Sequence, residues 1–222
     1  MKERRMPPLY LSVVHAQLFA LAGKIKAVIL DKIFNIETRL VPRSFRMPDE
    51  EGGSPYHPTP YGRLEKVMRF LKPDEKDVFV DLGCGKGRAV FLALTQKFKK
   101  VIGIESDRTT YDIAVRNAAN FRGRKKAGSL ELLHMDASDF DPSQGTVFFM
   151  FNPFGPKVLE KVLANIERSL KRNPRRIRLI YYIPRFLELV QKQTWLTRAG
   201  SVMNEACPVW EHTPLAGCPS RE

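Results

Sequence analysis

Three glycines spaced two residues apart follow a short apolar stretch: Gly83, Gly85 and Gly87. Glycine has no Cβ atom, so a turn that contains several glycines can adopt positive φ angles and bring bare backbone against a small ligand. The residues at 78–80 are apolar and favour a strand buried on both faces, which ends at Asp81. The sequence therefore predicts a strand, a ligand-binding turn and a helix that starts near Gly87.

The spacing of the glycines distinguishes between nucleotide ligands. Dinucleotide-binding turns have the pattern G-x-G-x-x-G. Here the pattern is D-x-G-x-G-x-G, and Arg88 stands where the third dinucleotide glycine would lie. A second apolar strand, predicted at 101–104, leads directly into Glu105, whose carboxylate can accept hydrogen bonds from both hydroxyls of a ribose. The pattern points away from NAD and toward a different ligand that contains a ribose.

The glycine-rich turn, Glu105 and a later Asp136–Ala137 pair together resemble the class I S-adenosylmethionine-dependent methyltransferases, over roughly residues 61–212. The resemblance implies S-adenosyl-L-methionine as the cofactor. It also implies an α/β fold: a doubly wound, mostly parallel, seven-stranded Rossmann-like sheet with helices on both faces. In the family, the residue that matches Asp136 accepts a hydrogen bond from the adenine amino group, and the backbone at Ala137 meets the ring. The implied cofactor-binding residues are Asp81, Gly83, Cys84, Gly85, Gly87, Glu105, Asp136 and Ala137.

The loop after the fourth predicted strand, at 147–151, begins Asn152, Pro153, Phe154. The resemblance implies that this loop meets the transferred methyl group, and enzymes of the family that alkylate amino nitrogens often carry Asn or Asp, two prolines and an aromatic residue there. Methyl transfer is an in-line displacement, so an Asn carbonyl that accepts the amine's hydrogens would aim the lone pair. This sequence has one proline, which puts Phe154 one position early. We expect Asn152, Pro153 and Phe154 to be catalytic; a plain turn before a helix is the alternative.

The segments before the glycine-rich turn differ in composition. Residues 1–38 carry a basic start and apolar residues at helical spacing, which predicts an amphipathic helix or helix pair rather than a secretion signal. Such basic helices can also lie on a lipid surface. Residues 39–60 are rich in proline and glycine and predict a linker or lid, with Thr59 and Tyr61 near the substrate. Residues 61–222 are the predicted methyltransferase domain, with a fifth strand at 177–183 and two weakly patterned strands in the tail.

Composition limits the partners and the compartment. The formal net charge is +13, which favours association with RNA, ribosomes or an anionic membrane surface. Three cysteines at no metal spacing predict free thiols in a reducing, cytoplasmic compartment, and the four scattered histidines give no reason to expect a metal site. The sequence does not indicate an oligomeric state.

Charge also differs between the two ends of the predicted sheet. Ligands bind at the carboxyl ends of the strands in such folds. The basic residues that precede strands are Lys72, Lys76, Lys97, Lys99, Lys100, Arg122, Arg124, Lys125, Lys126, Lys171, Arg172, Arg175 and Arg176. The acidic residues that follow strands are Asp81, Glu105, Asp107, Asp136, Asp139 and Asp141, and the basic residues that relieve them there are Lys86, Arg88, Arg108, Lys157 and Arg185. Folding of Arg39, Arg43, Arg46 and Arg63 over this edge would remove the asymmetry. An acidic edge suits a cationic acceptor, so the sequence favours methylation of an amino nitrogen of a protein, of the lysine type. An RNA methyltransferase acting on rRNA or tRNA and a catalytically inactive cofactor-binding module are the alternatives.

Overall fold

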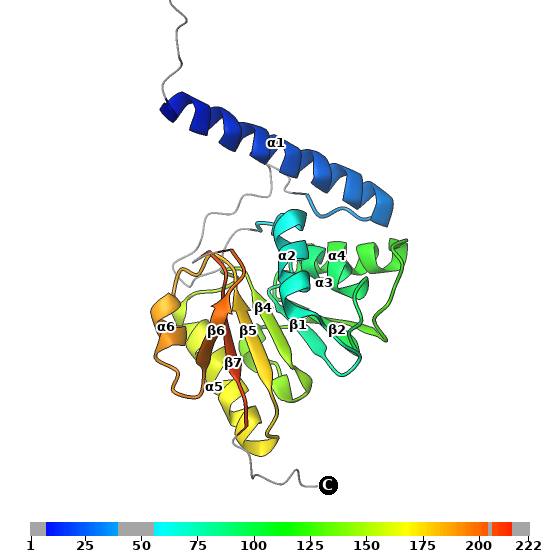
Figure 1. The fold of residues 1–222 in the computed structure, drawn as a ribbon. Helices are drawn as coiled ribbons and strands as arrows, with labels where there is room; N and C mark the ends of the chain where they lie inside the picture. Colours follow the sequence, from blue (N-terminus) through cyan, green and yellow to red (C-terminus); the bar gives the residue numbers. More distant parts are fainter. Residues whose placement is uncertain (1–7, 40–55, 204–205, 215–222) are drawn as a thin grey trace, which may run out of the picture.

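A computed structural model describes residues 8–39, 56–203 and 206–214, which form a seven-stranded sheet with the strand order β3-β2-β1-β4-β5-β7-β6 (Figure 1). The strands are β1 Val78–Leu82, β2 Lys100–Glu105, β3 Leu130–His134, β4 Val147–Met150, β5 Ile177–Tyr181, β6 Thr197–Ser201 and β7 Pro208–His212. Strands β1 to β5 are parallel, and β7 is antiparallel to both of its neighbours. The predicted fold class is confirmed. Residues 40–55, most of the predicted linker or lid, lie outside the described residues, as does Cys218.

Helices cover both faces of the sheet. They are α1 Pro8–Phe34, α2 Tyr61–Leu71, α3 Arg88–Leu94, α4 Arg108–Asn120, α5 Pro156–Arg172 and α6 Leu187–Gln191. Helices α2, α3 and α4 lie on one face, and α5 and α6 lie on the other (Figure 1). Local signals set two of the starts: the Asp107 carboxylate caps α4 by accepting a hydrogen bond from the Thr110 N–H, and Pro156 opens α5.

The alternation of side chains along β1 explains why this strand is apolar throughout. Val80 and Leu82 pack into the core on the α5 side, whereas Phe79 packs into the core on the α3 side. Because the chain continues from β1 to β2 on one side and from β4 to β5 on the other, the loops after β1 and β4 diverge. That switch point is where ligands bind in doubly wound sheets.

Helix α1 is one continuous helix whose last turns pack against the domain. The Phe34 ring lies 6.2 Å from the Tyr61 ring and 5.4 Å from the Phe121 ring, and Ala27 and Ile36 are buried in the same core. Apolar residues on the opposite face of α1 are exposed. The predicted helix is therefore present, but it is apolar on two faces rather than one. No helix in the described part of the chain is long and apolar enough to cross a membrane.

The fifth strand is shorter than predicted. It ends at Tyr181, and Ile183 has a φ of 47° and an exposed side chain. A β-branched residue rarely adopts a positive φ, and this conformation turns the chain out of the sheet. The turn brings residues 183–185 against the loop after β4, where the expected catalytic residues lie.

Candidate active site

The carboxylate of Glu105 lies across the start of the glycine-rich turn. Its Oε2 accepts a hydrogen bond from the Gly85 N–H at 2.8 Å, and its Oε1 accepts one from the Asp107 N–H at 2.9 Å. Burial raises the pKa of Glu105, and these two hydrogen bonds act against the rise. Each carboxylate oxygen still has a lone pair that could accept from a ribose hydroxyl, and that predicted contact stays a prediction.

Asp81 is a nearly buried carboxylate without a hydrogen-bond donor among the described residues; its exposed fraction is 3%. Burial raises the pKa of Asp81 to about 8, and the charge of Glu105 adds to the rise. A carboxylate removed from water in this way is stabilised by a cation or a donor supplied from outside the protein. The amino group and the sulfonium of S-adenosylmethionine are such groups, so the residues present fit this cofactor.

Two of the glycines are in close contact with other parts of the chain. A Cβ atom at Gly83 would lie 2.1 Å from the Cβ of Pro153, and one at Gly85 would lie 2.4 Å from Cε2 of the Tyr56 ring. Both glycines also have positive φ angles, 77° and 56°. Only glycine satisfies both conditions, so the turn is fixed between the loop after β4 and the segment that precedes α2.

Asn152 joins two loops at the carboxyl ends of β4 and β5. Its Nδ2 donates a hydrogen bond to the carbonyl oxygen of Ile183 at 2.5 Å, and its Oδ1 accepts one from the Arg185 N–H at 3.0 Å. The side chain is 7% exposed, and the residue has a φ of 44°, a conformation that asparagine tolerates better than most residues. That Asn152 aims an amine stays a prediction. Because Oδ1 already accepts one hydrogen bond, only its second lone pair and the backbone carbonyl of Asn152 could bind the amine.

Comparison with known proteins decides the family. Residues 79–173 match a family model described as a methyltransferase domain. A protein-lysine N-methyltransferase of Saccharolobus islandicus is 30% identical over 119 residues, which cover 53% of this chain and 70% of that protein. The chain belongs to the class I S-adenosylmethionine-dependent methyltransferases. It is an enzyme of that class, and its cofactor is S-adenosylmethionine.

Two further similarities differ in what they cover. An H3 lysine-79 specific histone-lysine N-methyltransferase of Dictyostelium discoideum is 29% identical over 144 residues, 57% of this chain but 8% of that protein. The crystal structure of an RNA methyltransferase from Salinibacter ruber, in complex with S-adenosyl-L-homocysteine, superposes with a TM-score of 0.51. It is 23% identical and covers 74% of this chain and 98% of that one. At that identity, the likeness supports the fold alone.

The other predicted cofactor residues of this methyltransferase differ in exposure. Cys84 is buried, and its Sγ would lie 3.0 Å from a Cβ at Gly103, so its side chain points into the sheet. Burial raises the pKa of the Cys84 thiol well above its usual value, and the charges of Asp81 and Glu105 add to the rise. Asp136 is exposed and accepts a hydrogen bond from the Ser138 N–H at 2.7 Å, which leaves its second oxygen for an adenine amino group. Their contacts with the cofactor stay predictions, as does that of the buried Ala137.

The residues expected to meet the substrate lie deeper than predicted. Tyr61 is 1% exposed, and its hydroxyl donates a hydrogen bond to Asp31 Oδ1 at 2.7 Å, so it is a core residue and does not face a substrate. Thr59 is also buried, and its part in a lid stays a prediction. Phe154 packs partly buried against the core on the α5 side. Tyr56, which was not among the predicted site residues, lies against the glycine-rich turn, because a Cβ atom at Gly85 would lie 2.4 Å from its ring.

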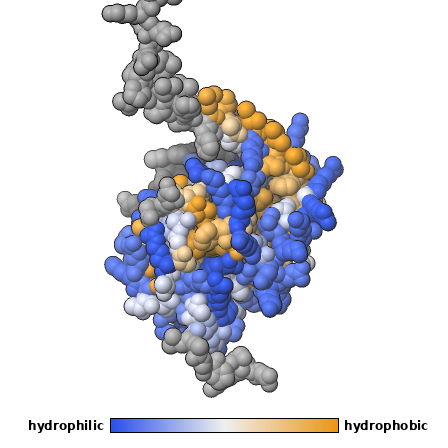
Figure 2. Space-filling view, in the orientation of Figure 1, coloured by the Kyte–Doolittle hydropathy of each residue, from blue (hydrophilic) through white to orange (hydrophobic). Residues whose placement is uncertain are grey.

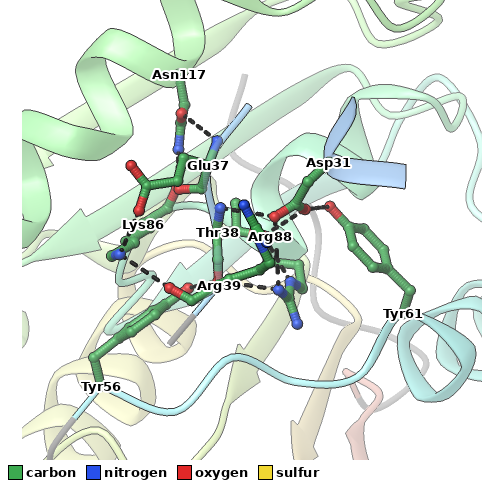
Figure 3. A network of polar contacts seen from close by, with 9 residues as sticks. All are labelled: Asp31, Glu37, Thr38, Arg39, Tyr56, Tyr61, Lys86, Arg88 and Asn117. Atoms are coloured by element: carbon green, nitrogen blue, oxygen red, sulfur yellow. Dashed lines mark hydrogen bonds and ion pairs between the residues drawn. The ribbon is translucent and has the colours of Figure 1, made fainter. Parts of the chain in front are cut away.

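A polar network, which we call the N-terminal clamp, ties the end of α1 to the glycine-rich turn (Figure 3). Its members are Asp31, Glu37, Thr38, Arg39, Tyr56, Tyr61, Lys86, Arg88 and Asn117. Arg88 donates hydrogen bonds to the hydroxyl and the carbonyl oxygen of Thr38, at 2.7 and 3.0 Å, and lies 3.9 Å from an Asp31 carboxylate oxygen. Lys86 pairs with Glu37 at 3.0 Å. Sequence reasoning missed the clamp, although one signal was present: Asp31 is the only acidic residue in the apolar helix α1.

The charges near the site differ in part from the prediction. Lys86 and Arg88, which were expected to relieve the acidic edge, are buried and paired within the clamp. The expectation that Asp141 lies at this edge is wrong, because Asp141 lies 3.8 Å from Arg172, at the opposite end of α5. Arg175, expected on the basic surface, instead donates hydrogen bonds to three backbone carbonyls of the neighbouring loops. Among the described side chains, no group of three His, Cys, Asp or Glu is placed to hold a metal ion.

Proposed function

We propose that this methyltransferase transfers the methyl group to an amino nitrogen of a protein, a lysine side chain. The observation that carries the proposal is sequence similarity: the Saccharolobus islandicus protein-lysine N-methyltransferase is 30% identical across 70% of its own length. The partial match to the Dictyostelium discoideum histone-lysine N-methyltransferase agrees with it.

The charge of the site supports a cationic acceptor. Carboxyl groups lie at the carboxyl ends of the first three strands: Asp81 within β1, Glu105 as the last residue of β2 and Asp136 just after β3. The two cations of the glycine-rich turn are paired within the clamp. Surface charge of one sign raises the local concentration of ligands of the opposite sign. A lysine ammonium would be attracted to this edge, whereas the phosphates of RNA would be repelled by it.

The chemistry that S-adenosylmethionine supplies when bound is a methyl group on a positively charged sulfur, open to in-line displacement. The chain's own part is to hold the acceptor and exclude water. Pro153 packs against Gly83, and the Asn152 side chain binds the loop after β5, so the two loops that border the switch point are held in fixed relation. The acceptor's ammonium group first loses one proton to water. A backbone carbonyl of the Asn152–Pro153 loop can then accept an N–H of the resulting neutral amine and direct its lone pair.

RNA is the second candidate acceptor. Its support is the net charge of +13 and the likeness in fold to an RNA methyltransferase. The fold hosts many acceptors, so a shared fold says little about the substrate. The basic residues that could bind RNA precede the strands, away from the carboxyl ends where the cofactor binds.

The test is methylation of a fractionated cell extract by the purified protein with radiolabelled S-adenosylmethionine. Matched samples are treated with protease or with ribonuclease, and labelled protein is hydrolysed to identify the methylated amino acid. Glu105→Ala serves as the variant with an impaired site, and Glu75→Ala, which removes an exposed carboxylate remote from the glycine-rich turn, serves as the control. We expect protease-sensitive label recovered as ε-N-methyllysine with wild type and Glu75→Ala, and little with Glu105→Ala. Label that ribonuclease removes, or label on another amino acid, would overturn the proposal.

A further inference from the structure

One face of α1 presents apolar side chains to solvent. Six residues of this outward face are between 43% and 59% exposed: Leu18, Leu21, Ile25, Val28, Ile29 and Ile33. Figure 2 shows hydrophobic residues along α1 across the upper side of the molecule, in contrast with the mostly hydrophilic surface of the domain below it. With 3.6 residues per turn, these six side chains fall within an arc of roughly 140°. A contiguous apolar surface of this kind marks an interaction site.

The charges that α1 itself places on and beside the outward face are all positive. At helical spacing, Lys24 and Lys26 border the arc on its two sides, and Lys32 lies within it near the end of the helix. Lys26 is paired with Glu65, while neither Lys24 nor Lys32 forms an ion pair with another described residue. The only acid of α1, Asp31, is buried on the opposite side, in the clamp. Helix α1 therefore gives this face apolar side chains and cations but no carboxylate, and the Glu65 carboxylate at its border is paired with Lys26.

The clamp holds this face in a fixed orientation. Asp31 is on the inward side of α1 and binds the Thr38 N–H, the Thr38 hydroxyl and the Tyr61 hydroxyl, at distances of 2.7 to 3.0 Å. Phe34 packs against Tyr61 and Phe121 on the same side. Turning the outward face into the domain would break these buried hydrogen bonds, so α1 presents its apolar face outward as a consequence of the fold.

We propose that the outward face of α1 binds the surface of an anionic lipid bilayer. An apolar arc flanked by lysines is the pattern of a helix that lies in the membrane interface, with its apolar side chains among the acyl chains and its ammonium groups at the phosphates. The row from Leu18 to Ile33 is about 22 Å long, too short to span a bilayer but long enough to lie in its surface. A second copy of the chain fits less well, because pairing two outward faces would bring their lysines together without a carboxylate to balance them.

The experiment is flotation of the full chain with vesicles of phosphatidylcholine, with and without phosphatidylglycerol. An apolar variant, Ile25→Ser with Ile29→Ser, is matched by Phe70→Ser with Val115→Ser, two exposed apolar residues on α2 and α4. A charge variant, Lys24→Glu with Lys32→Glu, is matched by Lys161→Glu with Lys192→Glu, two exposed lysines on or next to α5 and α6. Circular dichroism and S-adenosylmethionine binding establish that each variant is folded, and light scattering gives the oligomeric state.

We expect wild type to float with the anionic vesicles and to bind neutral vesicles far more weakly. The apolar variant should lose roughly 10- to 100-fold in partitioning, since two large side chains no longer enter the bilayer. The charge variant should lose at least about fivefold for each lysine, while both control variants bind as wild type does. Equal binding to neutral and anionic vesicles, unchanged binding of a folded apolar variant, or no flotation of wild type would each overturn the proposal. So would a wild-type dimer that the apolar variant converts to monomer, because the face would then bind a second copy.

Discussion

Replacing Asp81 by Asn tests whether this carboxylate strengthens cofactor binding while it lowers the stability of the ligand-free protein. Asp81 is the fourth residue of the central strand β1, 3% exposed, and none of the described residues donates a hydrogen bond to it. Burial and the charge of Glu105 raise its pKa from 3.8 to about 8. The Asp81→Asn variant keeps the size of the side chain and removes the charge.

The raised pKa gives a definite sign for the pH dependence of stability. Between about pH 4 and pH 8, the folded state binds the Asp81 proton more tightly than the unfolded state does. The free energy of unfolding of the ligand-free protein should therefore fall as pH rises through this range, with a limiting slope of about 1.4 kcal/mol per pH unit. The whole effect has an upper limit on the order of 5 kcal/mol. Asp81→Asn should lack this contribution and be more stable than wild type at pH 8.

Binding of the cofactor should shift Asp81 from the protonated to the charged form. A cationic group placed beside Asp81 favours the charged carboxylate and lowers its pKa. Binding of S-adenosylmethionine at pH 7 should therefore release protons from wild type, and affinity should rise from pH 6 to pH 8. Asp81→Asn should bind more weakly at pH 8 and show less proton release. Chemical denaturation between pH 5 and pH 9 measures the first effect, and calorimetry in buffers of different ionisation enthalpy measures the second.

Asp139→Asn is the matched control, because it removes one carboxylate from an exposed position on the segment after β3. If wild type, Asp139→Asn and Asp81→Asn share the same pH dependence of unfolding, the pKa of Asp81 is not raised and its charge does not destabilise the ligand-free protein. Equal proton release by wild type and Asp81→Asn would show that the cofactor's cation lies elsewhere.

Three further changes test the contacts of the site and the clamp. Asn152→Ala should lower stability by roughly 1 to 3 kcal/mol, because two partly buried backbone groups lose their partner and the positive φ suits alanine poorly. Calorimetry and turnover assays should find cofactor affinity and kcat reduced together, and a fall in kcat alone would support a direct role in aligning the amine. Glu105→Ala should leave the fold intact and weaken cofactor binding by about 1.5 to 3 kcal/mol, and unchanged affinity by calorimetry would remove Glu105 from the site. Tyr61→Phe should cost about 1.5 to 3 kcal/mol in unfolding free energy, because it removes a buried donor to Asp31; an unchanged denaturation midpoint would mean that this bond is not needed to hold α1.

The parts of the structure that sequence reasoning predicted are those set by local pattern. The apolar run before the glycines, the cap at Asp107 and the proline that opens α5 each identify an element from its own residues. Glu105 was predicted at the end of the second strand, and β2 does end there, with the Glu105 carboxylate 2.8 Å from the Gly85 N–H.

The parts that it missed depend on partners distant in sequence. The hydrogen bond between Asn152 and Ile183 spans 31 residues, and that between Arg88 and Thr38 spans 50. No local sequence pattern indicates that the Asn152 side chain is already hydrogen-bonded to the loop after β5. Asp141 was misplaced for a related reason, because the segment after β3 continues along α5 and carries it to the far end of the helix.

The clamp removes two cations from the surface beside the cofactor-binding residues. The chain carries a formal net charge of +13, and the glycine-rich turn itself contains Lys86 and Arg88. In an isolated turn, these two cations would lie beside Asp81 and Glu105 and offset them. The end of α1 instead provides Glu37 and Asp31, which pair with both cations and hold them out of solvent. With these two cations paired, the other basic residues that follow strands are Arg108, Lys157 and Arg185, and Arg108 pairs with Asp112. The N-terminal segment in this way changes the charge beside the cofactor-binding turn, although none of its described residues belongs to the glycine-rich turn or to the loop after β4.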